Sequence, residues 1–130
     1  MLARIRERKD QEGFTLIELL VVMIIIGILA AIAIPIFLNQ RKSAQDSAIK
    51  SDLRSAATEV ESFYVNNQKY PVDAAAFALL PIEKSPGVTL TYKPGTNAYC
   101  ISGKQADATH DWVYQSDNGG LQPGATVACP

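Results

Sequence analysis

The sequence predicts an α+β fold, in which one long N-terminal helix packs on a small antiparallel β-sheet. Three observations carry this prediction. An aliphatic run over residues 19–38 is long enough to cross a bilayer as a single helix. Apolar residues then recur at three- and four-residue spacing over residues 49–64. From residue 88 onward, β-branched and aromatic segments alternate with turn residues, as in a small sheet.

The helix is expected to continue well beyond the membrane-length run. No turn signal interrupts residues 39–65, so we predict one helix from about Phe14 to about Val65. In its second half, the apolar face is predicted to consist of Ile49, Leu53, Ala56, Ala57, Val60, Phe63 and Tyr64. The polar face is predicted to consist of Lys50, Asp52, Arg54, Ser55, Glu59, Glu61 and Ser62.

Two residues inside the aliphatic run weaken a helix. Pro35 lacks an amide N–H and should loosen the helix around Ala31, while Gly27 lowers helix stability. Gly and Pro are also frequent in ordinary membrane helices. The residues alone therefore leave open whether this segment bends or stays regular.

Residues 66–130 are expected to form the globular domain. Turn-forming residues over 66–71 end the long helix, and residues 74–80 can form one short helical turn. Strands are expected over residues 88–92, 97–102 and 111–116. The sequence Asp-Asn-Gly-Gly over residues 117–120 predicts a strong turn that leads into a C-terminal tail.

The cysteine content favours an oxidising compartment. Cys100 and Cys129 are the only cysteines, and 28 residues separate them. Beside a membrane segment, such a pair is best interpreted as a disulfide, which stabilises a loop of this size by about 3.5 kcal/mol. The alternative is a pair of unlinked, buried thiols in a cytosolic domain.

The sequence contains few side chains that indicate catalysis or metal binding. His110 is the only histidine and has no Ser or Cys nucleophile in a recognisable arrangement, so no enzyme is expected. No CxxC motif supports a zinc site. Four oxygen-bearing side chains could hold Ca²⁺, but their spacing does not fit an EF-hand: Asp107, Asp111, Asp117 and Asn118. Solvated turns explain them more simply, so no metal and no cofactor is predicted.

The charge balance gives no indication of a nucleic-acid partner. The chain carries 12 basic and 13 acidic residues, for a net charge of −1. Basic residues flank the aliphatic run on both sides, so the positive-inside count is nearly even. The short N-terminal tail and the cysteines favour an N-terminus inside and a C-terminus outside.

Glu18 stands at the start of the aliphatic run, ahead of 20 uncharged residues. A carboxylate at a membrane boundary is costly, so Glu18 is a functional candidate. It could instead snorkel at the interface of an ordinary single-pass anchor. Residues 1–13 lack the apolar region of a secretory signal, so a cut after Gly13 would leave the hydrophobic helix on the mature protein.

The N-terminal segment resembles the class III signal sequence of type IV pilins and of the related type II secretion pseudopilins. The resemblance rests on GFTLIELLVV over residues 13–22 and IGILAAIAIP over residues 26–35. It is close from residue 13 to about residue 42 and loose beyond. It implies that a prepilin peptidase cleaves after Gly13 and that Phe14 becomes the N-methylated first residue.

The same resemblance implies roles for five further residues. Glu18 is expected to neutralise the N-terminal amine of a neighbouring subunit's Phe14 during assembly. Gly27 and Pro35 match positions where family helices lose regularity in filaments. Cys100 and Cys129 resemble the disulfide-bounded C-terminal region of many pilins.

The implied protein is a structural subunit of a type IV pilus filament serving adhesion, twitching motility or DNA uptake. Its expected parts are a cleaved leader over 1–13, a transmembrane and filament-core helix over 14–38, an amphipathic helix over 39–65 and a globular domain over 66–130. Before assembly it would cross the cytoplasmic membrane once, with its N-terminus cytoplasmic. An assembly platform would then build an extracellular homopolymer of identical or related subunits.

Two alternatives stay open at this point. The chain could be a pseudopilin of a type II secretion system, or a non-polymerising, membrane-anchored domain outside the cytoplasm. Neither alternative, nor the pilin interpretation, predicts direct nucleic-acid binding.

Overall fold

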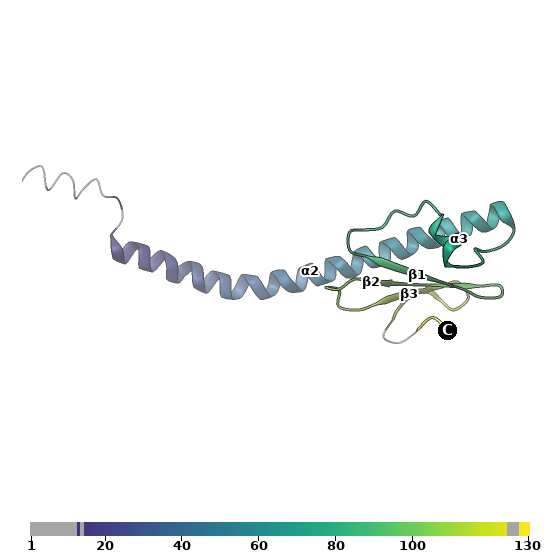
Figure 1. The fold of residues 1–130 in the computed structure, drawn as a ribbon. Helices are drawn as coiled ribbons and strands as arrows, with labels where there is room; N and C mark the ends of the chain where they lie inside the picture. Colours follow the sequence, from purple (N-terminus) through teal and green to yellow (C-terminus); the bar gives the residue numbers. More distant parts are fainter. Residues whose placement is uncertain (1–12, 14, 125–127) are drawn as a thin grey trace, which may run out of the picture. The chain divides into compact units, whose positions relative to one another are not determined.

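The structure is a computed structural model that describes residues 13, 15–124 and 128–130. The chain divides into two compact units, with the boundary between Leu38 and Asn39. Helix α2 (Leu16–Asn67) contributes residues to both units (Figure 1). The second unit adds a four-stranded antiparallel sheet, so the predicted α+β class is confirmed.

In the first unit, α2 presents an apolar surface. From Leu16 to Leu38, the large hydrophobic side chains are between 46% and 82% exposed. An 18-residue window of α2 has a mean hydropathy of 3.1, which suits a membrane-crossing helix by length and composition. Helix α2 continues without interruption through both Gly27 and Pro35. In the free chain, the segment between Gly27 and Pro35 is helical throughout.

The sheet of the second unit is a meander in the order β1-β2-β3-β4. Its strands are β1 (Thr89–Pro94), β2 (Tyr99–Lys104), β3 (Trp112–Gln115) and β4 (Gly120–Pro123). The sequence predicted the first three strands to within two residues at each end. It did not predict β4, which pairs with β3 from Gln115↔Gly120 to Trp112↔Pro123. Gly119 and Gly120 have φ of 84° and 74°, and these conformations, which glycine adopts freely, reverse the chain between the two strands.

The core lies between the second part of α2 and the sheet (Figure 1). Its buried residues are Ile49, Leu53, Ala56, Ala57, Val60, Phe77, Val88, Tyr92, Tyr99 and Ile101. Of the predicted apolar face, Phe63 is only half-buried and Tyr64 is 38% exposed. The buried face of α2 therefore becomes narrower toward the C-terminal end of the helix.

The prediction that Asp52 belongs to the polar face of α2 is wrong. Asp52 is 6% exposed, on the buried side of α2. Its carboxylate accepts hydrogen bonds from the backbone N of Ser85 at 2.7 Å and from the Ser85 hydroxyl at 3.0 Å. Burial of a carboxylate is tolerated when hydrogen bonds replace its water. Asp52 therefore fixes the loop before β1 against the helix.

The segment between α2 and the sheet contains helix α3 (Ala74–Ala78). Asp73 caps it by accepting a hydrogen bond from the backbone N of Ala76 at 2.8 Å. The Phe77 ring stacks on Tyr92 with 4.8 Å between centroids. The Tyr92 hydroxyl donates to the carbonyl oxygen of Pro71 at 2.9 Å, and burial raises the pKa of Tyr92 to about 12.

Aromatic side chains cluster in the second unit. All five tyrosines belong to one series of neighbouring rings, whose members are Tyr64, Tyr70, Tyr92, Tyr99 and Tyr114. The one tryptophan, Trp112, lies beneath Lys50, whose Nζ is 4.0 Å from the ring centroid. The buried Tyr99 hydroxyl donates to Glu61 Oε1 at 3.1 Å, and burial raises the pKa of this phenol well above its usual range.

Gly103 of β2 lies directly against α2. A Cβ added here would lie 2.6 Å from Cγ2 of Ile49 and 3.3 Å from Cγ of Leu53. Gly103→Ala should therefore lower the free energy of unfolding by about 1–3 kcal/mol, because the helix or the strand must shift. Unfolding of the full chain in detergent micelles, followed in urea, measures this loss.

The matched background for this test is Ile49→Leu, which removes the branch methyl that the new Cβ would meet. Adding Gly103→Ala to Ile49→Leu should cost less than adding it to the wild-type chain. Equal losses in the two backgrounds would show that the contact with Ile49 does not set the requirement for glycine.

Candidate assembly site at the start of the apolar helix

Glu18 is held locally by Thr15 at the beginning of α2. The backbone N of Thr15 donates to Glu18 Oε2 at 2.9 Å, and the backbone N of Glu18 donates to Thr15 Oγ1 at 3.3 Å. These reciprocal bonds form a capping box, which satisfies backbone donors that the first helical turn leaves free. A negative charge is also favourable at this end of the helix dipole.

The capping role of Glu18 was missed in the sequence analysis. The pattern Thr-x-x-Glu ahead of an apolar run is a recognised signal for it, and it is present over residues 15–18. Glu18 Oε2 is engaged with Thr15, while Oε1 accepts no hydrogen bond within the described part of the chain. The carboxylate therefore has one oxygen available for a cation from outside the chain.

Five apolar side chains on one side of the same helical segment line a shallow apolar surface: Leu16, Leu19, Leu20, Met23 and Ile24. All of them are at least half exposed. The carboxylate of Glu18 thus belongs to a helix whose surroundings must be lipid or other apolar helices. An unpaired charge is costly in either environment.

The residues predicted for processing lie immediately before the helix. Gly13 is exposed and has φ of 65°, and an added Cβ at this position would meet no other described residue within 4 Å. Phe14, the predicted site of N-methylation, lies outside the described residues. The structure therefore shows space around Gly13 but does not describe the peptide bond at which cleavage is expected.

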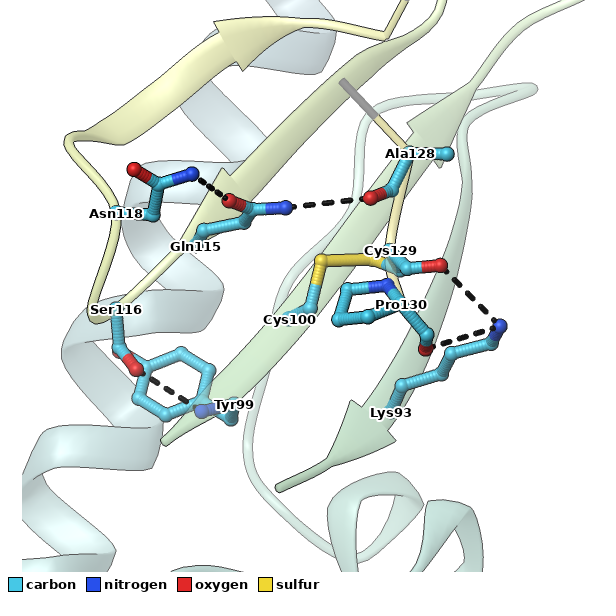
Figure 2. The surroundings of a disulfide bond; sticks show 9 residues. All are labelled: Lys93, Tyr99, Cys100, Gln115, Ser116, Asn118, Ala128, Cys129 and Pro130. Carbon is cyan, nitrogen blue, oxygen red and sulfur yellow. Dashed lines mark hydrogen bonds between the residues drawn. A yellow bond between two sulfur atoms is a disulfide. The ribbon is translucent and has the colours of Figure 1, made fainter. Parts of the chain in front are cut away.

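The C-terminal segment is fastened to the sheet by a disulfide between Cys100 and Cys129 (Figure 2). The side chain of Gln115 donates to the carbonyl oxygen of Ala128 at 3.2 Å. Lys93 Nζ lies 3.5 Å from the carbonyl oxygens of both Cys129 and Pro130. Two side chains from the strands on either side of β2, which carries Cys100, thus support the covalent link.

Two of the acidic side chains considered for Ca²⁺ form ion pairs. Asp107 pairs with Arg41 at 3.8 Å, and Asp111 pairs with Lys104 at 3.2 Å. Within residues 13, 15–124 and 128–130, no three His, Cys, Asp or Glu side chains gather as metal ligands would. These exposed ion pairs contribute little to stability.

Comparison with known proteins identifies a known motif at the N-terminus and a relative that matches most of the chain. Residues 8–34 match the prokaryotic N-terminal methylation motif. The "Type IV wide pilus major component PilA4" of Thermus thermophilus is 34% identical over 121 residues, which are 92% of each protein. The chain therefore belongs to the type IV pilin family.

Other relatives match about half of the chain. The "Type IV major pilin protein PilA" of Myxococcus xanthus is 47% identical over 58 residues, 45% of this chain and 26% of that protein. The "Type II secretion system core protein G" of Pseudomonas aeruginosa is 37% identical over 65 residues, 50% of this chain and 46% of that protein. The resemblance to the pilin and pseudopilin families, as predicted from residues 13–42, is confirmed.

Proposed function

We propose that this chain is a structural subunit of a type IV pilus filament, without catalytic activity, that polymerises through α2. The observation that carries the proposal is the apolar surface from Leu16 to Leu38, where the large hydrophobic side chains are 46–82% exposed. A surface of this kind is stable only against lipid or against other apolar helices. A filament core made of such helices would replace the lipid.

We propose that the chain reaches the filament after processing in the cytoplasmic membrane, with its N-terminus cytoplasmic. A prepilin peptidase would cut after Gly13, and Phe14 would then be N-methylated. The match of residues 8–34 to the methylation motif supports both steps. The open space around Gly13 also supports cleavage there, because a peptidase must enclose the bond it cuts.

In this proposal Glu18 pairs with the N-terminal amine of a neighbouring subunit's Phe14. Oε1 of Glu18 accepts no hydrogen bond from the described residues, which supports such a pair, since a second hydrogen bond is possible without breaking the bond to Thr15. In an apolar filament core, two opposite charges are tolerated together where either one alone would be costly.

Gly27 and Pro35 are proposed as the positions at which α2 loses regularity on assembly. Pro35 supplies no amide N–H to the helix, and Gly27 has a low helix propensity. Both features lower the cost of unwinding the intervening turns in a crowded core. In the free chain these turns remain helical.

The similarity data favour a pilus over a secretion pseudopilus. Similarity to the Thermus pilus component covers 92% of this chain, including the sheet, whereas similarity to the Pseudomonas secretion protein covers 50%. The globular part of the chain is thus matched by a pilus relative. A non-polymerising anchored domain remains the contrasting outcome in the experiment below.

The proposal is tested by shearing cells that make the wild-type chain and blotting the sedimented material. Processed chains should appear in the sheared, sedimentable fraction with an N-terminus at position 14. Gly13→Leu should remain in the membrane with its leader attached, because the bulky side chain blocks cleavage. Lys84→Ala, an exposed change in the second unit, serves as the control and should behave as wild type. A wild-type chain found only in washed membranes would identify an anchored domain instead of a filament subunit.

A further inference from the structure

The turn between β3 and β4 contains an Asn-Gly pair, and we propose that Asn118 is a site of spontaneous deamidation. The backbone nitrogen of Gly119 loses its proton and attacks Cγ of Asn118, which forms a five-membered succinimide ring and releases the side-chain nitrogen as ammonia. Water then opens the ring to give aspartate or isoaspartate. The net change is one amide plus water converted to one carboxylate and ammonia, so no oxidant or cofactor is required.

The turn leaves the reacting groups accessible. Asn118 and Gly119 are both exposed, and Asn118 borders an open groove of about 890 Å³ that water can enter. Gly119 has no Cβ to crowd the attacking nitrogen. That nitrogen makes no hydrogen bond to any other described residue. The nucleophile is therefore not held by the fold.

A second contact favours loss of the proton from Gly119. The side-chain amide of Gln122 donates to the carbonyl oxygen of Asn118. This oxygen belongs to the same peptide unit as the Gly119 nitrogen, so the hydrogen bond polarises that unit and makes its N–H more acidic. The other four asparagines are Asn39, Asn66, Asn67 and Asn97, and none of them precedes a glycine.

Deamidation here would disturb a partly buried relay of two hydrogen bonds (Figure 2). Asn118 Nδ2 donates to Gln115 Oε1 at 2.9 Å, and Gln115 Nε2 donates to the carbonyl oxygen of Ala128 at 3.2 Å. Gln115 is only 6% exposed, so its amide has few other partners. The relay connects the turn to the residue that precedes Cys129.

A carboxylate at position 118 can only accept hydrogen bonds. If the Gln115 amide keeps its orientation, two oxygens face each other at the turn. If the amide turns to donate to the carboxylate, its own oxygen faces the carbonyl of Ala128. One of the two hydrogen bonds is lost in either case, so the modification should loosen the segment that the disulfide fastens.

The first experiment measures the reaction itself. The folded, oxidised full chain is incubated in detergent micelles at mildly alkaline pH and mapped by peptide mass spectrometry with isoaspartate detection. Position 118 should convert well ahead of positions 66, 67 and 97, which serve as controls within the same digest. Asn118→Gln should stay unmodified at this turn, because its longer side chain would have to close a larger ring. Conversion at position 118 no faster than at the control positions would overturn the proposal.

The second experiment measures the consequence for the C-terminal segment. In Asn118→Asp, a small thiol should reduce the Cys100–Cys129 disulfide about fivefold faster than in the wild-type chain, because one hydrogen bond that holds the segment is lost. Asn97→Asp adds the same charge in the turn between β1 and β2, at a side chain that makes no hydrogen bond to Gln115, and should be reduced at the wild-type rate. Equal rates for Asn118→Asp and wild type, or equal acceleration by Asn97→Asp, would overturn the link between the relay and the disulfide. Neither experiment depends on filament assembly.

Discussion

Glu18→Gln is expected to remove most filament assembly while leaving the chain inserted in the membrane and cleaved after Gly13. The amide keeps an oxygen that can accept from Thr15, so the start of α2 stays capped. It removes only the negative charge. The partner amine then enters an apolar core unpaired, at a cost of about 3–5 kcal/mol, or roughly a hundredfold or more in assembly.

Thr15→Ala is the matched control for this prediction. It removes the hydroxyl that caps the Glu18 backbone N and keeps the carboxylate, so it should cost about 1 kcal/mol of local helix stability and leave assembly largely intact. Glu18→Ala loses both functions and should assemble no better than Glu18→Gln. Filament yield in the sheared fraction, with N-terminal sequencing of the membrane fraction, distinguishes the variants. Normal assembly of Glu18→Gln with failure of Thr15→Ala would make Glu18 a helix cap and not a partner for an amine.

Replacement of both Cys100 and Cys129 by serine should lower the free energy of unfolding of the second unit by about 3.5 kcal/mol. The disulfide joins residues 29 positions apart, so its loss releases a long loop in the unfolded state. For a small unit this is a large fraction of the total stability. Thermal and urea unfolding of the oxidised chain and of the double variant, in the same micelles, give the difference.

Two controls separate the covalent link from the contacts around it. Wild-type chain reduced by thiol should match the double variant, because both lack the cross-link. Lys93→Ala removes the long contacts to the carbonyl oxygens of Cys129 and Pro130 and should change stability by about 1 kcal/mol or less. A double variant as stable as the oxidised wild type would show that the sheet and α2 hold the segment without the disulfide.

The main elements could be predicted because their signals are local and repeated. The aliphatic run and the spacing of apolar residues predicted a helix from about residue 14 to 65, and α2 spans Leu16–Asn67. Strand β4 could not be predicted in this way. Its residues Gly-Leu-Gln-Pro have low strand propensity, and it is a strand because the preceding turn places it against β3.

At Asp52, the helical repeat of buried positions and the type of the residue give opposite predictions. Asp52 lies three residues after Ile49 and four before Ala56, on the stripe that the helical repeat predicts to be buried. Its charge, however, predicts a place on the polar face. The partner that makes burial tolerable, Ser85, lies 33 residues further along the chain, and no local pattern indicates such a contact.

The candidate site was only partly predictable for a related reason. The position of Glu18 ahead of the aliphatic run identified it as a functional candidate, but the same residue also caps its own helix through Thr15. The Thr-x-x-Glu motif over residues 15–18 indicates the helix cap, whereas the aliphatic run that follows indicates a role in the membrane or in assembly. The proposed partner of Glu18 belongs to another subunit, so neither a single sequence nor a single chain contains that contact.

The gathering of all five tyrosines and Trp112 in the second unit gives the protein a built-in optical reporter. Residues 15–38 contain phenylalanine as their only aromatic residue. The tyrosine and tryptophan signals in fluorescence and near-ultraviolet dichroism therefore come from the second unit alone, whether the apolar helix is in lipid or in detergent. Folding of that unit can thus be followed before, during and after the helix changes its surroundings, without adding a label.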